Sequence, residues 1–397
     1  MIEINKDVVF VQGFHSGAIY NFNSGNVYSV NKDSCKVIND YIAGDFLSDE
    51  ARQYIELLVS NDLLCEKFNY KKYIPKPTSA KLDLCWLEIT QQCNCRCVHC
   101  YEGNTHIKCK DALSLSEWKN VIEQIKDCGV KRVVIIGGEP CIHPEIDEIA
   151  KSVSSANINV TIFTNGTYIT ESLKNIIISN NIKMKFSLYG HCSDVHDNIT
   201  KKQGSFNELV ENIKFFISKN VQVDVAVVIM RENEEYYNDI IEFLKSLGVK
   251  RYRIDVIRET FCNNTSIHMP TKTDVINSVK RTQPIFSKIS KEKFDNAFYC
   301  NTCWNGKLVV CEDGTVLPCV FARNISLGNI RNKQISDIIF SKETSKCWGL
   351  SFDHIKDCCN CEFRFACKDC RPLAEAANEY YAKNPRCTYN VYNGEWK

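Results

Sequence analysis

From about residue 82 onward, short apolar runs alternate with stretches that repeat apolar residues at helical spacing. The runs that we expect to form strands are Cys85–Thr90, Arg132–Ile136, Asn159–Phe163, Lys183–Leu188, Val221–Ile229 and Tyr252–Ile257. The intervening stretches that we expect to form helices are Ser116–Cys128, Pro144–Val153, Thr170–Ser179, Ser205–Lys219 and Glu234–Leu247. This alternation predicts an α/β fold with a parallel sheet, curved into a barrel or part of one. In such folds the chemistry gathers on the loops that follow the strands.

The N-terminal segment has a different pattern. Asp7–Gln12 and Ala18–Val30 alternate apolar and polar residues, which is typical of small antiparallel strands. Two helical patterns follow at Asp33–Ile42 and Ser48–Ser60, the second with a serine cap and an acidic first turn. The prolines of Ile74–Thr78 then predict a linker.

The strand–helix rhythm ends near Phe261, and cysteines become frequent after it. We therefore predict three domains, at residues 1–73, 82–260 and 261–397. The last of these has so little regular core that we expect metal to hold it together.

The composition narrows the class of protein. The chain has 397 residues and a formal net charge of +1, which argues against nucleic acid or an acidic membrane surface as a partner. Its 23 cysteines are an odd number, so they cannot all pair internally. We see no signal peptide at Met1–Asp7 and no apolar run that would span a bilayer. The cysteine usage therefore indicates a reduced, cytoplasmic protein whose thiols bind metal.

Three cysteines with the spacing C-x3-C-x2-C, Cys93, Cys97 and Cys100, follow the first barrel strand. Three thiolates this close can bind three irons of a cubane cluster and leave the fourth iron open for chemistry. A zinc site is the alternative, but zinc favours paired C-x2-C units and four closed ligands. We interpret Cys95, inside the loop, as a bystander.

Three further loops follow the second, third and fourth expected strands. Gly137–Pro140 contains two glycines that allow close approach to the backbone, and the Glu139 carboxylate or nearby carbonyls are candidate acceptors for an ammonium group. Thr164–Thr167 and Ser187–Gly190 follow the third and fourth strands, where Ser187 would bond a ribose hydroxyl or only cap its strand. Each signal is weak alone, but all fall at the carboxyl ends of consecutive strands, on one rim.

Taken together, these motifs make the chain resemble a radical S-adenosylmethionine (SAM) enzyme. The cysteine loop is similar to the family's C-x3-C-x-Φ-C, with His99 at the usually aromatic place, and Gly137–Pro140 is similar to its GGEP motif. The resemblance implies a partial (β/α)6 TIM-like barrel and a [4Fe–4S] cluster whose open iron chelates SAM. It also implies one-electron cleavage of SAM to methionine and a 5′-deoxyadenosyl radical that abstracts hydrogen from the substrate. The SAM contacts it implies are Gly137, Gly138, Glu139, Asn165 and Ser187.

The C-terminal cysteines resemble the SPASM extension of that family, which implies two auxiliary [4Fe–4S] clusters and three clusters in all. The distal cluster would be held by Cys358, Cys361, Cys367 and Cys387. The nearer cluster would be held by Cys303, Cys319 and Cys370, with Cys311 or Cys300 as fourth ligand or an open site. Only two residues separate Cys367 from Cys370, where the family usually has three, and this departure puts the role of Cys370 in doubt. A pair of structural zinc sites is the alternative, and Cys347 and Cys359 read as spare thiols.

The N-terminal strands and helices resemble the PqqD-like (winged-helix) precursor-recognition module of peptide-modifying enzymes, or else they form a packing cap. The leading hypothesis is a maturase that acts on a ribosomally synthesised precursor peptide through its leader and forms a crosslink. The first choice of bond is a cysteine thioether. A carbon–carbon crosslink, or formylglycine formation as in anaerobic sulfatase maturases, is the rival reading, and an electron carrier is the non-enzymatic one. A flavodoxin or ferredoxin would supply electrons.

No general base can be assigned from the sequence. The candidates near predicted loops are His143, His191, His196 and Asp197, and we expect the histidines to be solvated. Tyr189 would wall the SAM pocket or simply pack.

Overall fold

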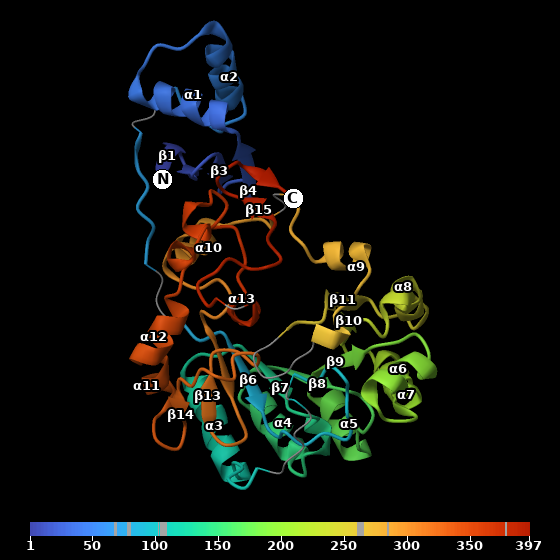
Figure 1. Cartoon of the computed structure of the whole chain (residues 1–397). Coiled ribbons are helices and arrows are strands. Elements are labelled where there is room, and N and C mark those ends of the chain that lie inside the picture. Colours follow the sequence, from blue (N-terminus) through green and yellow to red (C-terminus); the bar gives the residue numbers. More distant parts are fainter. Residues whose placement is uncertain are drawn as a thin grey trace. The chain divides into compact units, whose positions relative to one another are not determined.

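The computed structural model describes residues 1–66, 70–77, 81–101, 103, 109–259, 266–283, 286–377 and 379–397. The chain forms two compact units (Figure 1). The first unit combines Met1–Ser79 with Lys280–Asn305 and Trp348–Lys397, and the second combines Ala80–Val279 with Gly306–Cys347. The predicted boundary at 260/261 and the linker residue Thr78 lie outside the described residues, and the division into three domains stays a prediction.

The second unit is built on one mixed sheet in the order β11-β10-β9-β8-β7-β6-β12-β13-β14. Its strands are β6 (Leu84–Glu88), β7 (Arg132–Ile136), β8 (Asn159–Thr164), β9 (Lys183–Leu188), β10 (Val223–Ile229), β11 (Arg251–Val256), β12 (Lys307–Val310), β13 (Thr315–Leu317) and β14 (Gly328–Asn329). Strands β6 to β11 are all parallel, and the six strands expected from the apolar runs are confirmed (Figure 1). Strand β12 adds a seventh parallel strand beside β6, which the sequence did not indicate.

The five expected helices connect the parallel strands, and a short sixth helix at Ser193–Thr200 was not expected. They are α3 (Leu115–Asp127), α4 (Ile146–Ser155), α5 (Glu171–Ser179), α6 (Ser193–Thr200), α7 (Ser205–Ser218) and α8 (Tyr237–Ser246), with short helices α9 (Thr273–Ser278), α11 (Ile335–Ile339) and α12 (Lys342–Trp348) after them. Ser114 begins α3 with a reciprocal capping box to Glu117, and Thr170 caps α5. The buried face of α3 consists of Trp118, Val121, Ile122 and Ile125, at helical spacing.

The two faces of the sheet differ in polarity toward β11. In β9, Met184, Phe186 and Leu188 are fully buried, whereas Lys185 and Ser187 on the opposite face are only partly covered. Parallel strands with both faces covered are usually apolar throughout. The face of β9 that carries Lys185 and Ser187 is therefore less completely covered than the opposite face.

The first unit contains a five-stranded antiparallel sheet in the order β4-β3-β2-β1-β5. The helices and strands of the first unit are β1 (Ile2–Asn5), β2 (Val8–Gln12), β3 (Gly17–Asn21), β4 (Asn26–Val30), α1 (Lys32–Ala43), α2 (Asp49–Ser60), β5 (Lys71–Lys72), α10 (Lys291–Tyr299), α13 (Arg371–Ala376), β15 (Tyr389–Asn390) and β16 (Glu395–Trp396). Because side chains alternate along a strand, this sheet carries two cores. Phe10 and Ile19 pack with α1 and α2 on one face. Val9 and Tyr20 pack with Phe365 of the C-terminal region on the other.

No helix among the described residues is both long and apolar enough to cross a bilayer.

Candidate functional site

The three-cysteine loop leaves the end of β6 and is anchored on α6. The amide of Arg96 donates to the carbonyl of Thr200 over 2.8 Å, and the amide of Val98 donates to the carbonyl of Ile199 over 3.0 Å. Cys100 closes the loop on itself, since its amide donates to the carbonyl of Cys97 over 3.2 Å. Helix α6 thus fixes the backbone that presents the three thiols.

Asn165, from the loop after β8, lies directly against the cysteine loop. Its Nδ2 donates to Asn94 Oδ1 over 2.8 Å and lies 3.4 Å from Cys95 Sγ and 3.8 Å from Cys93 Sγ. Asn94 in turn donates from Nδ2 to Thr167 Oγ1 over 2.9 Å. The structure therefore brings Asn165 to the thiols, and two loops that are 70 residues apart in the sequence form one assembly.

The side chain of Glu139 holds these loops together through hydrogen bonds. It is fully buried, and its Oε1 accepts from Thr164 Oγ1 at 2.6 Å and from the amide of Cys141 at 2.9 Å. Its Oε2 accepts from the amide of Asn165 at 2.6 Å. Burial raises the pKa of this carboxyl, while these hydrogen bonds act to lower it. Since both oxygens are used inside the protein, the neighbouring carbonyls become the stronger candidates for receiving an ammonium group.

The two glycines of this loop are required by close packing of backbone. A Cβ on Gly137 would lie 2.3 Å from the carbonyl oxygen of Thr90, and one on Gly138 would lie 2.4 Å from that of Gln92. The amide of Gly138 donates to the same Thr90 carbonyl over 2.7 Å. The close approach that we expected of a ligand is thus made here by the loop after β6.

An aromatic wall lines the rim beside Ser187. The ring of Tyr189 packs edge-on against His99, with 4.5 Å between centroids, and stacks on His196 at 5.5 Å. The Ser187 hydroxyl lies within hydrogen-bonding reach of the Tyr189 hydroxyl. Burial lowers the pKa of both His99 and His196 to about 4, so both imidazoles are neutral near pH 7.

The expectation that His196 is solvated was wrong. This side chain lies in α6 with 1% exposure, because its Nδ1 accepts from the amide of Tyr189 at 3.1 Å. The neighbouring Asp197 binds the start of α7. Its carboxylate accepts from the amide of Gly204 at 2.7 Å and from Ser205 Oγ at 2.7 Å. These two residues are structural supports of the rim.

Strand β12 brings further side chains to the same rim. Glu312, just after it, accepts at Oε2 from the amide of Gln91 over 2.8 Å. Cys311 is buried, and Arg323 Nη1 lies 3.6 Å from its sulfur. Arg323 also forms an ion pair with the buried Glu88 and packs over the ring of Tyr101. Sequence reasoning missed Glu88 and Arg323. A carboxylate inside an otherwise apolar strand was the available signal for the first.

The cysteines assigned to the distal cluster lie together in the first unit. Burial raises the pKa of the Cys358 thiol, and the Cys367 and Cys387 thiols raise it further. The pKa of the Cys361 thiol is raised in the same way, by burial first and then by neighbouring groups that include Cys358 and Cys367. Arg281, which sequence reasoning did not identify, donates from Nη1 to Cys367 Sγ and pairs by a β-bridge with Cys387.

Two cysteines assigned to the nearer cluster are joined through side chains of the first unit. Asn301 Oδ1 accepts from the amide of Cys303 at 2.9 Å, and its Nδ2 donates to Asp369 Oδ2 at 3.1 Å. Asp369 Oδ1 accepts from the amide of Cys370 at 2.7 Å. The remaining candidates are Cys300, in the first unit, and Cys311 and Cys319, in the second. The full ligand set of this cluster stays a prediction.

The donor sets fit iron–sulfur clusters. Within the described ranges, no group of three or more His, Cys, Asp or Glu side chains is spaced to hold a single metal ion. Cysteine thiolates are the ligands of such clusters, and hydrogen bonds to the sulfurs tune the reduction potential. The Arg281 donation to Cys367, the amide of Cys95 at 3.4 Å from Cys93 Sγ and that of Phe321 at 3.5 Å from Cys319 Sγ are such bonds.

Comparison with known proteins agrees with this geometry. A family model of the radical SAM superfamily matches residues 87–244. The subtilosin biosynthesis protein AlbA of Bacillus subtilis is 27% identical over 315 residues, which is 75% of this chain and 69% of AlbA. The AdoMet-dependent heme synthase of Methanosarcina barkeri is 24% identical over 342 residues, 79% of this chain and 97% of the synthase.

A solved structure extends the likeness over almost the whole chain. The crystal structure of Streptococcus suis SuiB bound to its precursor peptide SuiA superposes with a TM-score of 0.60 at 15% identity, covering 97% of this chain and 99% of SuiB. At this identity the match shows the fold. The superfamily binds a [4Fe–4S] cluster and SAM, and our prediction that the cysteine loop and the rim hold them stays a prediction. The chain therefore carries a radical SAM domain at residues 87–244.

Proposed function

We propose that this enzyme is a peptide maturase that abstracts hydrogen from a ribosomally made precursor and forms a crosslink, with a cysteine thioether as the leading bond. The superfamily match alone leaves the substrate open, since one relative is a heme synthase. The observation that carries the proposal is the full-length likeness to SuiB, which includes the N-terminal sheet and the cysteine-rich C-terminal region. AlbA, a bacteriocin biosynthesis protein, points the same way.

The rim supplies the parts that such a reaction needs. When bound, the cluster and SAM supply a radical that removes one hydrogen atom from substrate carbon. Cys93, Cys97 and Cys100 would hold the cluster, and Ser187 and the carbonyls near Gly138 would hold SAM. For a thioether, the hydrogen atom goes to 5′-deoxyadenosine, the thiol proton leaves to solvent, and one electron leaves the substrate. The two auxiliary clusters we propose would accept that electron.

The sheet of the first unit supports a role in precursor recognition. Among its described strands, β4 pairs on one side only, with β3. Asn26, Ser29 and the ring-bearing Tyr28 on this strand are exposed, the last by 38%. An exposed strand edge binds an extended peptide through main-chain hydrogen bonds. We propose that the leader of the precursor adds to β4.

Formylglycine formation and carbon–carbon crosslinking are the competing outcomes. The N-terminal segment, residues 1–73, argues against a sulfatase maturase, because we expect the resemblance to those enzymes to begin only at the barrel. Mass spectrometry distinguishes all three. A candidate precursor peptide is incubated with reconstituted enzyme, SAM and a flavodoxin or ferredoxin as reductant.

A loss of two hydrogens that blocks alkylation of one cysteine supports the thioether. The same mass loss with every cysteine still alkylated shows a carbon–carbon bond. Deleting residues 1–73 should abolish modification of the full precursor while SAM cleavage continues. Unchanged modification after this deletion would overturn the recognition role of the first unit.

A further inference from the structure

A cavity of about 600 Å³ lies at the amino-terminal halves of β9, β10 and β11, in the second unit. Its lining includes four cationic side chains, Lys185, Lys250, Arg251 and Arg253, and one carboxylate, Asp224. The lining thus has a net charge of +3 (four positive charges minus one), although the whole chain has only +1. Such a local excess attracts anionic ligands.

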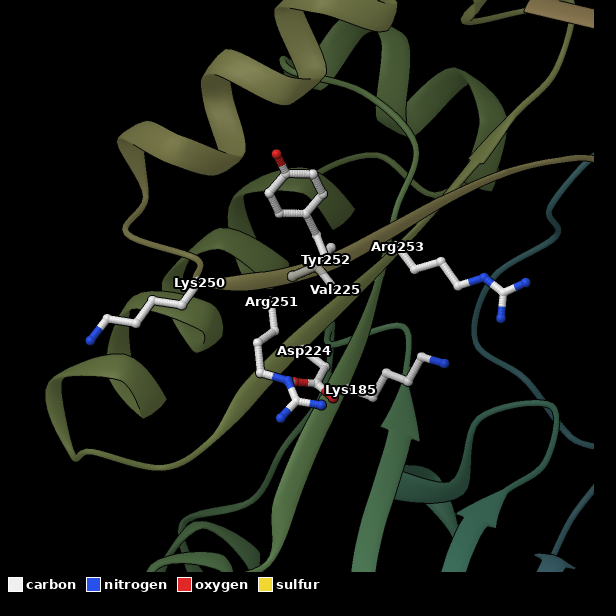
Figure 2. Close-up of a pocket in the computed structure, with 7 residues that line it drawn as sticks. All are labelled: Lys185, Asp224, Val225, Lys250, Arg251, Tyr252 and Arg253. Carbon is white, nitrogen blue, oxygen red and sulfur yellow. The ribbon is translucent and has the colours of Figure 1, made fainter. Parts of the chain in front are cut away.

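Strand register places three of these side chains on one face. Lys185 pairs with Asp224, which pairs with Arg251, and one row farther along Ser187 pairs with Ala226, which pairs with Arg253. Figure 2 shows Lys185 and Arg253 extending in the same direction and Arg251 beside Asp224, whereas Lys250 and Tyr252 point elsewhere. The cationic face therefore reaches the row of Ser187, our candidate SAM contact.

Lys185 lies close to another cation, Arg253. It is partly buried, its ammonium lies 4.5 Å from the centre of the Phe163 ring, and burial and Arg253 lower its pKa by more than Asp224 raises it. Asp224 is engaged by Arg251 Nε at 3.0 Å, and Arg253 reaches Asp255 at 3.4 Å while remaining 73% exposed. A bound anion would relieve the repulsion between Lys185 and Arg253.

The edge of the sheet indicates the shape of the ligand. Among the described strands, β11 ends the sheet, and Arg251, Tyr252 and Arg253 are all exposed on it. Arg251 and Arg253 are two residues apart on one face, about 7 Å. This is the repeat of alternate side chains in an extended peptide, and opposite charges in facing positions of neighbouring strands attract.

We propose that β11 binds an extended segment of the peptide substrate that carries acidic residues at alternate positions, which face Arg251 and Arg253 with Lys185 behind them. This site deepens the proposed maturase function and rests on it. It gives the enzyme a second strand edge, on the unit that holds the radical site, with a charge requirement that β4 lacks. The segment bound there would cross, next to Arg253, the row that contains Ser187 two strands away.

The test measures binding without turnover. A fluorescein-labelled peptide Gly-Glu-Ser-Glu-Ser-Glu-Gly is titrated with the full-length reconstituted enzyme, and anisotropy is recorded. We expect Arg253→Gln and Lys185→Gln each to weaken binding roughly fivefold, and 0.5 M salt to weaken it further. Lys151→Gln, which removes an exposed charge on α4, should leave binding and SAM cleavage unchanged.

Three results would overturn the proposal. The first is equal binding of the glutamine-substituted peptide. The second is equal binding of a peptide with the three glutamates adjacent, because the site reads alternate positions. The third is displacement of the peptide by SAM alone, which would make the cations part of the SAM site. Because anisotropy needs no reaction, absence of crosslinking would refute the maturase function without affecting this measurement. Iron content and circular dichroism confirm that each variant is folded.

Discussion

The side-chain amide of Asn301 donates to the carboxylate of Asp369 across 3.1 Å, and both residues are buried. Asn301 also accepts from the amide of Cys303, and Asp369 accepts from that of Cys370. One hydrogen bond thus joins the two peptide segments that present these thiols. It explains how Cys370 can be positioned although its spacing from Cys367 departs from the family pattern.

Replacing Asn301 by alanine should therefore cost the enzyme one auxiliary cluster. The change leaves buried polar groups without their partner, at about 1–3 kcal/mol of unfolding free energy. Iron and acid-labile sulfide per chain should fall by about a third from the three-cluster level. Asn393→Ala, an exposed asparagine of the same unit, is the matched control. An unchanged iron content in Asn301→Ala would show that this pair does not position a cluster ligand.

Cys95 provides a test of the ligand assignment at the radical site. Its sulfur is buried within 3.4 Å of Asn165 Nδ2, close to Cys93. Since the family spacing is met by Cys93, Cys97 and Cys100, Cys95→Ala should keep the cluster and SAM cleavage, whereas Cys97→Ala should lose both. Electron paramagnetic resonance of the reduced protein and chromatographic detection of 5′-deoxyadenosine give the two readouts. Loss of the cluster in Cys95→Ala would require the ligands to be reassigned.

His196 should make the stability of the enzyme depend on pH. Its folded pKa is lowered to about 4 from an ordinary value of 6.5, so the unfolded chain binds the proton more readily. The contribution of neutral His196 to the free energy of unfolding is complete above pH 6.5. It is lost as the pH falls toward 4, and the loss is at most roughly 3 kcal/mol. The pKa of His99 is also lowered to about 4, so this residue makes stability fall with falling pH in the same way. His196→Phe should reduce the drop in melting temperature between pH 7.5 and pH 5 by about half.

The control for this change is His354→Phe, since this histidine is exposed and lies in the first unit. An identical pH dependence in wild type and His196→Phe would mean that other groups dominate.

Arg281 should raise the reduction potential of the distal auxiliary cluster. Its guanidinium donates to Cys367 Sγ and to the carbonyl of Lys368, and a cation beside a cluster favours the reduced form. Arg281→Gln should lower the potential by about 50 mV, since 59 mV corresponds to a tenfold change for one electron. Redox titration followed by electron paramagnetic resonance measures it. Arg52→Gln, on the exposed face of α2, should leave the potential unchanged, and so would Arg281→Gln if the guanidinium were remote from the cluster.

The parallel core could be predicted because its signals are local. Six strands alternate with helices, and the glycine, asparagine and serine loops follow strands whose carboxyl ends must share a rim. The same reasoning failed for α6, which has only eight residues and begins without a side-chain cap. His196 was misplaced for that reason, since a residue thought to lie in a loop is expected to be solvated.

The remaining site residues were hidden because their roles depend on distant partners. Glu88 and Arg323 are 235 positions apart, and Arg281 and Cys367 are 86 apart. No periodicity or spacing encodes such a pair. The sequence also suggested that Glu139 or neighbouring carbonyls meet a ligand, and only the structure shows that the Glu139 carboxylate accepts hydrogen bonds from Thr164 and Asn165.

Strand β12 has a consequence for how the enzyme is made. It pairs with β6, the strand that leads into the cysteine loop, yet it emerges from the ribosome after all the other parallel strands. Until then β6 pairs only with β7 and its other side is an open sheet edge. The amide of Gln91 also lacks its hydrogen bond to Glu312. A nascent chain that stops before residue 307 would have all three thiols of the radical site but an incomplete cradle for them. We therefore expect stable iron loading to require synthesis of the last quarter of the protein.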